Sequence, residues 1–258
     1  MRFASLGSGS KGNALVVEAE STRVMLDCGF SVRDATNRLA RVGLAPSDLS
    51  AVVVTHEHSD HAGGVYAFAR RFGLPVWMTH GTWVAIRDQG GDAGYGAAVN
   101  LIESQLGFAV GDLLMQPISV PHDAREPVQF VFSDGDKRLG VLTDIGCSTP
   151  HVESALSGCD ALVLETNHEL EMLMNGDYPP PLKARIAGRH GHLDNSTSAA
   201  ILAALDRSRL QHVVAAHLSQ KNNTPELART ALARALGCAN DWVGVATQGE
   251  GFGWRMIA

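Results

Sequence analysis

The chain alternates short apolar runs with polar stretches along its whole length. Many of these runs are rich in valine and isoleucine, and short runs with β-branched residues are typical of buried strands. A Ser-Asp-Gly-Asp sequence at 133–136 predicts the tight turn of a hairpin. The pattern as a whole predicts strands over residues 13–19, 23–27, 51–55, 75–79, 99–103, 107–110, 112–120, 127–134, 138–143, 160–165, 211–216, 242–246 and 251–257.

Segments with helical periodicity separate the predicted strands. They predict helices over residues 31–42, 61–72, 149–157, 169–175, 180–188, 194–206 and 225–236. The last of these has Thr224 as a candidate N-cap and Pro225 in its first turn. Residues 88–98 are rich in glycine, and we expect them to form a mobile loop. Because strands and helices mix without a linker or a repeat, residues 1–258 are predicted to form one layered α/β domain.

Composition and charge exclude several classes of protein. Hydrophobic residues make up 45% of the 258 residues and charged residues 19%, which excludes a disordered chain and a coiled coil. The net charge of −6 excludes a basic nucleic-acid coat and a polybasic membrane binder. An acidic chain can still act on phosphates if bound cations reverse the local charge. We expect a cytoplasmic protein with four free cysteine thiols, because neither a signal peptide nor a membrane-spanning run is evident.

Polar side chains follow several of the predicted strands at the point where each strand ends. All of them carry nitrogen or oxygen donors that suit a metal ion or acid–base chemistry. The carboxyl ends of strands are where layered α/β proteins place their sites, so these residues are expected to converge. They are Asp27, His56, His122, Asp144, Glu165 and His217.

The strongest local signal is the segment Thr-His-Glu-His-Ser-Asp-His at 55–61. Alternation along an extended chain places the imidazoles of His56 and His58 on one side, whereas Glu57 and Ser59 point away. The chain then turns into a helix start, so Asp60 and His61 face a second point nearby. Three imidazoles and a carboxylate within six residues predict a site for Zn²⁺, Mn²⁺ or iron.

This segment after a buried strand resembles the metallo-β-lactamase superfamily of binuclear hydrolases, and the other strand-end residues fall in that family's order. The resemblance implies an αββα sandwich of two mixed sheets flanked by helices, with two divalent metal ions, Zn²⁺ or Mn²⁺. It implies that Asp27 braces the metal loop and that Asp144 bridges the metals. One metal would be held by His56, His58 and His122, and the other by Asp60, His61 and His217.

The spacing further along the chain indicates which branch of the superfamily the sequence resembles. The 72 residues between Asp144 and His217 (145–216) are too few for the inserted domain of the β-CASP nucleases. They contain Glu165 and His192, which look like the glutamate–histidine pair of the tRNA 3′-processing endonuclease (tRNase Z) branch. The segments 8–13, 164–168 and 218–225 look most like the YycJ (WalJ) group, compact cytoplasmic phosphodiesterases to which a DNA exonuclease activity is attributed.

The resemblance implies a binuclear metal-dependent phosphodiesterase that degrades DNA as an exonuclease. Asp60, Glu165 and His192 are the predicted catalytic residues. His192 would protonate the leaving group, and Glu165 would orient its imidazole. His192 could instead cap the following helix or bind substrate, and His190 competes with it for the catalytic role.

Two other functions remain open at this point. A hydrolase of a small ester, lactone or thioester would share the metal core without needing the glutamate–histidine pair. A metal-binding or redox module would need a partner domain. The choice between DNA and RNA, the mode of attack, the native metal and the oligomeric state also stay open. Further possible substrate-binding residues are Ser8, Asn13, Asn167 and His168.

Overall fold

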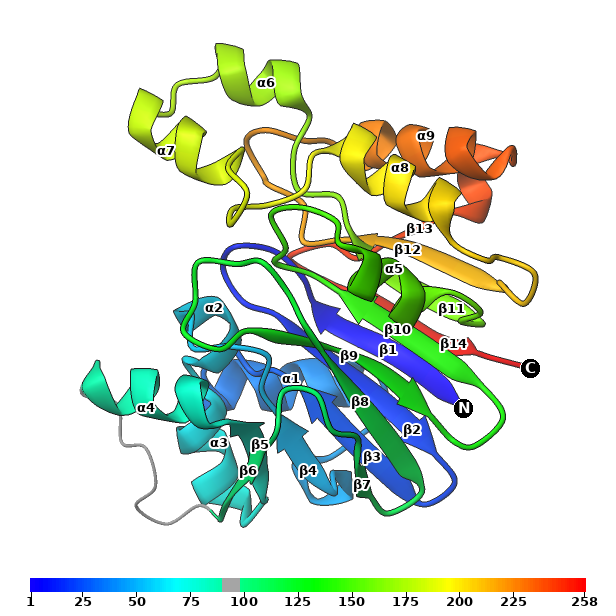
Figure 1. Cartoon of the computed structure of the whole chain (residues 1–258). Coiled ribbons are helices and arrows are strands. Elements are labelled where there is room, and N and C mark those ends of the chain that lie inside the picture. The colour runs from blue at the N-terminus through cyan, green and yellow to red at the C-terminus, as the bar shows by residue number, and fades with distance from the viewer. Residues whose placement is uncertain (90–97) are drawn as a thin grey trace.

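The computed structural model describes residues 1–89 and 98–258, and its strands form two sheets that pack face to face (Figure 1). Strands of the first sheet are antiparallel from β14 to β3 and parallel from β3 to β6. Within the described residues this sheet has seven strands, in the order β14 (Phe252–Met256), β1 (Arg2–Gly7), β2 (Ala14–Ala19), β3 (Thr22–Leu26), β4 (Ala51–Val53), β5 (Val76–Thr79) and β6 (Val99–Ile102).

The second sheet repeats this mixed pattern. Its strands are parallel from β13 to β10 and antiparallel from β10 to β7. The turn predicted at 133–136 connects β9 to β10 as an antiparallel hairpin, as expected. Among the described residues the seven strands run in the order β13 (Gly244–Val245), β12 (His212–Ala216), β11 (Ala161–Glu165), β10 (Arg138–Leu142), β9 (Val128–Ser133), β8 (Leu113–Ser119) and β7 (Phe108–Val110).

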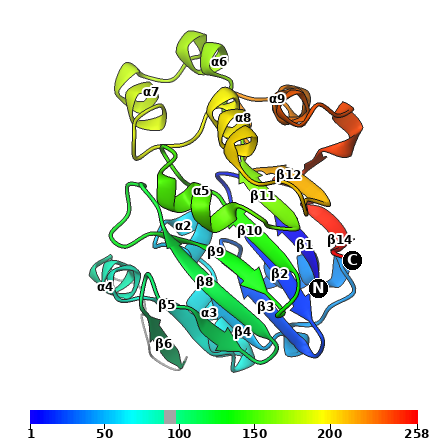
Figure 2. The same ribbon diagram turned by 45° about the vertical axis from the view of Figure 1, so that its right-hand side comes forward.

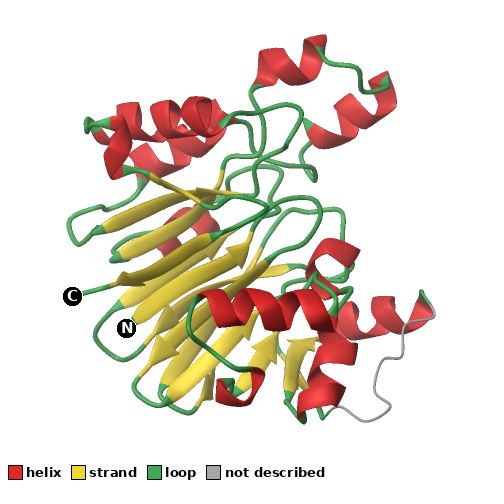
Figure 3. Ribbon diagram, turned by 180° about the vertical axis from the view of Figure 1, so that it is seen from behind, coloured by secondary structure: helices red, strands yellow, loops and turns green. Residues whose placement is uncertain are grey.

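Helices cover the outer faces of both sheets (Figures 1 and 2). Against the first sheet pack α1 (Val32–Arg41), α2 (Ser59–Ala62), α3 (Val65–Phe72) and α4 (His80–Asp88), and against the second pack α5 (Pro150–Leu156), α8 (Asn195–Ala204) and α9 (Pro225–Leu236). Two more helices, α6 (Leu170–Asn175) and α7 (Pro180–Ile186), project beyond the end of the second sheet (Figure 3). Short 3-10 turns lie at Pro46–Asp48 and Asn240–Trp242.

Three apolar layers hold the sandwich together. The middle layer lies between the two sheets and contains the fully buried rings of Phe3 and Phe130. An outer layer under α1 and α3 includes Leu39 and Phe68, and the other, under α8 and α9, includes Leu202. Burying apolar surface in each layer stabilises the fold by roughly 25 cal/mol per Å². This packing fixes the two sheets against each other and holds their strand ends in place. The predicted αββα sandwich is confirmed.

The secondary structure differs from the sequence-based expectation chiefly in three places. Strand β1 was not predicted, although it pairs with both β2 and β14. Helix α4 was also not predicted; it begins after Thr79, whose side chain accepts a hydrogen bond from the Thr82 backbone N–H. The helix predicted over 61–72 is two helices, because the chain turns at Gly63–Gly64 and a Cβ on Gly64 would clash with the Phe30 carbonyl.

The loop predicted over 88–98 stays a prediction for most of its length. Asp88 ends α4, and residues 90–97 lie outside the described residues. Other features agree with expectation: Thr224 caps α9, Pro225 begins it, and all four cysteines are free. No helix within 1–89 and 98–258 has both the length and the apolar character that crossing a membrane requires. One domain over residues 1–258 stays a prediction.

Candidate active site

The carboxyl ends of parallel strands from both sheets meet at one edge of the sandwich, and the predicted site residues gather there. Asp27 follows β3, Asp144 follows β10, and His217 follows β12. All three have positive φ, at 61°, 52° and 55°, which is uncommon for residues other than glycine. Three such residues at one edge indicate that the surrounding structure holds the backbone in strained turns to aim these side chains.

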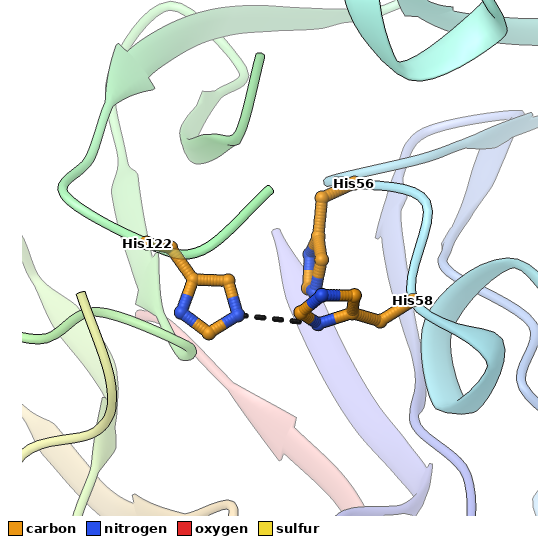
Figure 4. Close-up of side chains that lie close together, drawn as sticks. All are labelled: His56, His58 and His122. Atoms are coloured by element: carbon orange, nitrogen blue, oxygen red, sulfur yellow. Dashed lines mark hydrogen bonds between the residues drawn. The ribbon is translucent and has the colours of Figure 1, made fainter. Parts of the chain in front are cut away.

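Three imidazoles form the first cluster (Figure 4). Nδ1 of His58 lies 3.3 Å from Nε2 of His122. The opposite nitrogens are already used: Nε2 of His58 donates to the Asp123 carbonyl at 3.2 Å, and Nδ1 of His122 donates to the Gly191 carbonyl at 3.1 Å. Nε2 of His56 is buried and has no hydrogen-bond partner within residues 1–89 and 98–258. One nitrogen of each ring is therefore available to a shared ligand.

Asp60, His61 and His217 form the second cluster. Nε2 of His217 and Nε2 of His61 each lie 3.5 Å from Oδ2 of Asp60. Nδ1 of His61 donates to Oδ2 of Asp27 at 2.8 Å, which fixes the ring. A histidine held by a carboxylate in this way is typical of metal ligands, because the second partner sets the ring orientation and raises its basicity.

Asp144 lies between the two clusters and shows that the donors fit a pair of metal ions. One of its oxygens is 2.9 Å from Nε2 of His61, and the other is 3.9 Å from Nε2 of His122. Ligand atoms of His56, His61 and Asp144 lie within 4.8 Å of one another. A buried imidazole nitrogen without a hydrogen bond among the described residues, as at Nε2 of His56, is costly unless a cation satisfies it.

Asp27 also anchors the segment that carries four of the donors. Its carboxylate accepts hydrogen bonds from the backbone N–H and the hydroxyl of Thr55, at 2.8 and 2.9 Å. Gly29 packs so closely that a Cβ there would clash with the Asp60 carbonyl. These contacts hold the His56–His61 segment against β3, as the resemblance implied for Asp27. Glu57 turns away, as predicted, and accepts a hydrogen bond from the Arg125 backbone N–H at 2.8 Å.

Burial and charge divide the histidines into two kinds. Burial lowers the pKa of His56 and of His122, and neighbouring imidazoles lower the pKa of His56 further. Burial alone would also lower the pKa of His61 and His217. The surrounding carboxylates together outweigh it: Asp144, Asp27 and Asp60 raise the pKa of His61 well above its usual value. Asp144, Asp60 and Glu165 raise the pKa of His217 to about 10. The first cluster therefore presents neutral imidazoles, which bind metals, and the second surrounds carboxylates whose charge attracts a cation.

The predicted glutamate–histidine pair is formed beside these clusters. Nδ1 of His192 lies 2.8 Å from Oε1 of Glu165, and Nδ1 of His217 lies 3.3 Å from the same oxygen. The other oxygen accepts backbone hydrogen bonds from Ile145 and Leu193. Glu165 is fully buried, so it acts through the two histidines that it holds.

The structure distinguishes His192 from the alternatives considered for it. The N-cap of α8 is Asp194, whose side chain accepts hydrogen bonds from the Ser196 and Thr197 backbone N–H groups. His192 therefore does not cap this helix. His190 is exposed and contributes only its carbonyl oxygen, which accepts from the Asp123 backbone. Burial would lower the pKa of His192, but Glu165 raises it above the usual value.

Four residues predicted as possible substrate contacts are buried next to the site. Ser8 Oγ accepts a hydrogen bond from the His217 backbone N–H at 2.9 Å, and Asn167 Nδ2 donates to the His217 carbonyl at 2.8 Å. Asn13 Nδ2 donates to Asp60 Oδ2 at 3.2 Å. His168 is buried, and its Nε2 has no hydrogen-bond partner. Their role as substrate contacts stays a prediction.

Residues 22–217 match the model of a protein family described as a β-lactamase superfamily domain. The chain belongs to the metallo-β-lactamase superfamily. It is 33% identical over 240 residues to exodeoxyribonuclease YycJ of Bacillus anthracis, covering 92% of this chain and 89% of that protein. It is 32% identical over 249 residues to exodeoxyribonuclease WalJ of Streptococcus pneumoniae, covering 95% and 91%. The chain is thus a metallo-β-lactamase-fold hydrolase, with YycJ and WalJ as homologues.

A solved structure gives the same fold. The metallo-β-lactamase fold protein YhfI of Bacillus subtilis superposes with a TM-score of 0.76, covering 98% of each chain at 14% identity. An identity this low shows the shared fold and nothing finer. The superfamily fold explains why donors distant in sequence meet at one edge of the sandwich.

The superfamily site opens into a pocket of about 350 Å³. His58, Asp60, Asp144, His192 and His217 lie on its floor. Other residues that line it were not predicted from the sequence, because they belong to no metal-binding motif. These are Ser10, Asp123, Tyr178, Leu182, Arg185 and Ile186.

Proposed function

We propose that the two clusters hold two divalent metal ions, Zn²⁺ or Mn²⁺. His56, His58 and His122 would bind one ion, Asp60, His61 and His217 the other, with Asp144 shared between them. The donors are imidazole nitrogens and carboxylate oxygens without any thiolate, a set that suits both metals. The buried Nε2 of His56, which has no hydrogen-bond partner among the described residues, supports this assignment.

When bound, such metal ions lower the pKa of an attacking water and neutralise charge that develops on phosphoryl oxygens. The protein's own contribution is to hold the metal-binding histidines in fixed orientations. Asp27 orients His61, Glu165 orients His217, and the Gly191 carbonyl orients His122. Outer contacts of this kind typically change metal affinity or activity by about 10–100-fold.

We infer that His192 is the general acid of the reaction. Its Nδ1 donates to Glu165, and its side chain is 22% exposed in the pocket. The other nitrogen, Nε2, makes no hydrogen bond among residues 1–89 and 98–258, so it is available to donate a proton to a leaving oxygen. A phosphodiester expels an alkoxide that needs such a proton, whereas an activated ester does not. This pair beside a two-metal cluster is the observation that carries the phosphodiesterase assignment.

DNA, attacked from an end, is the proposed substrate. The homologues YycJ and WalJ are exodeoxyribonucleases. Each is about one-third identical to this chain, over nearly its whole length. The residues of the metal clusters and the Glu165–His192 pair occur together in this chain, which supports the phosphodiesterase proposal.

Cleavage of end-labelled nucleic acid by protein loaded with Zn²⁺ or Mn²⁺ tests this proposal. We expect single nucleotides to be released from an end of DNA, with slower release from RNA and none after chelation. A lactone and a thioester serve as comparison substrates. Fast turnover of either one, with no cleavage of DNA under any metal, would contradict the nuclease assignment and favour a small-molecule hydrolase.

A further inference from the structure

One wall of the active-site pocket has a different character from its floor. The floor consists of imidazoles and carboxylates, whereas the wall comes from α7 and the residues just before it. This wall presents the Tyr178 ring and the aliphatic side chains of Leu182 and Ile186. Helices α6 and α7 project beyond the second sheet, so the wall stands over the strand ends (Figures 1 and 3).

Tyr178 is held as a rigid, half-buried platform. Three consecutive prolines, 179–181, follow it and restrict the backbone. Lys221, from the loop before α9, places its Nζ 5.2 Å from the centre of the Tyr178 ring. Lys221 makes no hydrogen bond or ion pair within the part of the chain that the structure describes. The ring therefore has a cation on one side while it also lines the pocket.

The wall also contributes a cationic side chain, that of Arg185, although the chain carries a net charge of −6. Residues 178–192 include Lys183, Arg185 and Arg189 and no aspartate or glutamate. Arg185 lines the pocket and pairs with Asp123, at 2.6 Å between Nε and Oδ2. A ligand that fits this wall has a flat apolar part for the ring and an anionic part near the guanidinium. A nucleotide has both.

The size of the pocket limits how that nucleotide can bind. About 350 Å³ lies near the lower end of the range for ligand pockets and leaves room for about one nucleotide unit. A base that meets the Tyr178 ring face to face must leave its duplex stack. Base–aromatic stacking tolerates any base, which is what an enzyme that degrades DNA of arbitrary sequence requires.

We propose that Tyr178 stacks on the base of a nucleotide next to the scissile phosphodiester, and that this nucleotide is unpaired when it binds. Arg185 lies where it contacts the adjoining phosphate. This inference rests on the proposed nuclease function and deepens it, because it assigns an unpaired DNA end as the substrate form.

A double-mutant cycle tests the proposal by combining a change in the protein with the removal of a base from the DNA. The probes are an end-labelled single-stranded oligodeoxynucleotide and matched copies with an abasic residue on either side of the first cleaved bond, cut by the metal-loaded protein. On intact DNA, Tyr178→Ala should lower kcat/KM by about 5- to 150-fold, the usual effect of removing one base–aromatic stack. One abasic copy should lose a similar factor with the unchanged protein, and Tyr178→Ala should then cause almost no further loss.

Two further variants control this cycle. Tyr178→Phe keeps the ring and should stay within about twofold of the unchanged protein on intact DNA. Met174→Ala changes an exposed side chain of α6 outside the pocket and should change neither substrate's rate. Metal content should stay the same throughout.

The possible outcomes separate this inference from the proposed function. If Tyr178→Ala slows intact and abasic DNA equally, or slows neither, base stacking at Tyr178 is overturned while the nuclease assignment stands. If the unchanged protein cleaves neither DNA with any metal, the proposed function fails, and the inference fails with it.

Discussion

The two halves of the active site are built in different ways. The N-terminal half supplies four donors from one segment, His56 to His61, which follows β4 and runs into α2. The C-terminal half supplies one residue at a time, with Asp144, Glu165 and His217 each at the end of a different parallel strand. The first half is set by local backbone geometry, and the second by the register of three strands.

This difference determines how each half is stabilised. The N-terminal segment is held at a few points, chiefly by Asp27, so its donors move together. The C-terminal residues are held by a shared buried group, because Glu165 contacts both His192 and His217. A change in the first half should therefore act on metal binding, and a change in the second should also act on proton transfer.

Removing a donor from the N-terminal segment should have the largest effect. His58→Ala deletes the nitrogen that faces His122, so we expect the loss of one of two metal ions per chain. The rate on DNA should fall by about 10³-fold, because metal ions stabilise developing charge by several kcal/mol. Elemental analysis measures the metal content, and an end-label assay measures the rate of DNA cleavage. The matched control is His151→Ala, at an exposed histidine on α5, which should keep two metal ions and the full rate. Two bound metals with full activity would contradict the assignment.

Removing the proposed acid of the C-terminal half should separate proton transfer from metal binding. His192→Ala should slow DNA cleavage by about 10²–10⁴-fold while the protein keeps both metals. Cleavage of a p-nitrophenyl phosphodiester should slow far less, because nitrophenolate leaves without a proton. The adjacent His190→Ala is the control, since that exposed side chain lies outside the pocket lining. Equal losses on the two substrates would reject the acid role, and loss of metal would make His192 a ligand.

The pH dependence of DNA cleavage should test whether Glu165 controls the protonation of His192. Burial alone would raise the pKa of Glu165, but His192 lowers it to about 2, and the resulting charge raises the pKa of His192. The acid form of His192 is present below that raised pKa and is lost as the pH rises through it. Glu165→Gln removes the charge, so the alkaline fall in DNA cleavage should move to lower pH. Glu226→Gln, on the exposed start of α9, should leave the profile unchanged. An alkaline limb that does not move in Glu165→Gln would contradict the coupling.

The smallest effect should come from the backbone support of His217. Ser8→Ala leaves the buried His217 N–H without its acceptor, so the free energy of unfolding should fall by about 1–3 kcal/mol. Urea denaturation measures this change. Ser10→Ala, at an exposed neighbouring position, should change stability by less than about 0.5 kcal/mol. A Ser8→Ala protein as stable as the unchanged one would mean that β12 holds His217 without this contact.

The sequence predicted the N-terminal half of the site more fully than the pocket around it. Residues 55–61 carry donor type and spacing together, so their clustering follows from local geometry alone. Tyr178 and Arg185 show no comparable signal, because only the position of α7 brings them over the metal clusters. Strand β1 was missed for a similar reason: its pairing with β2 and β14 stabilises a segment whose own pattern is weak.

The sequence by itself determined the chemistry available to this protein: its donor types, the strands that carry them and the family that uses them in this order. Only the tertiary structure decided which nitrogen of each imidazole is free and that Glu165 holds two histidines. The physical reason is the separation along the chain between the residues that contact one another. Spacing within one segment is set by backbone geometry, whereas contacts across 20 to 200 residues depend on how the two sheets and their helices pack.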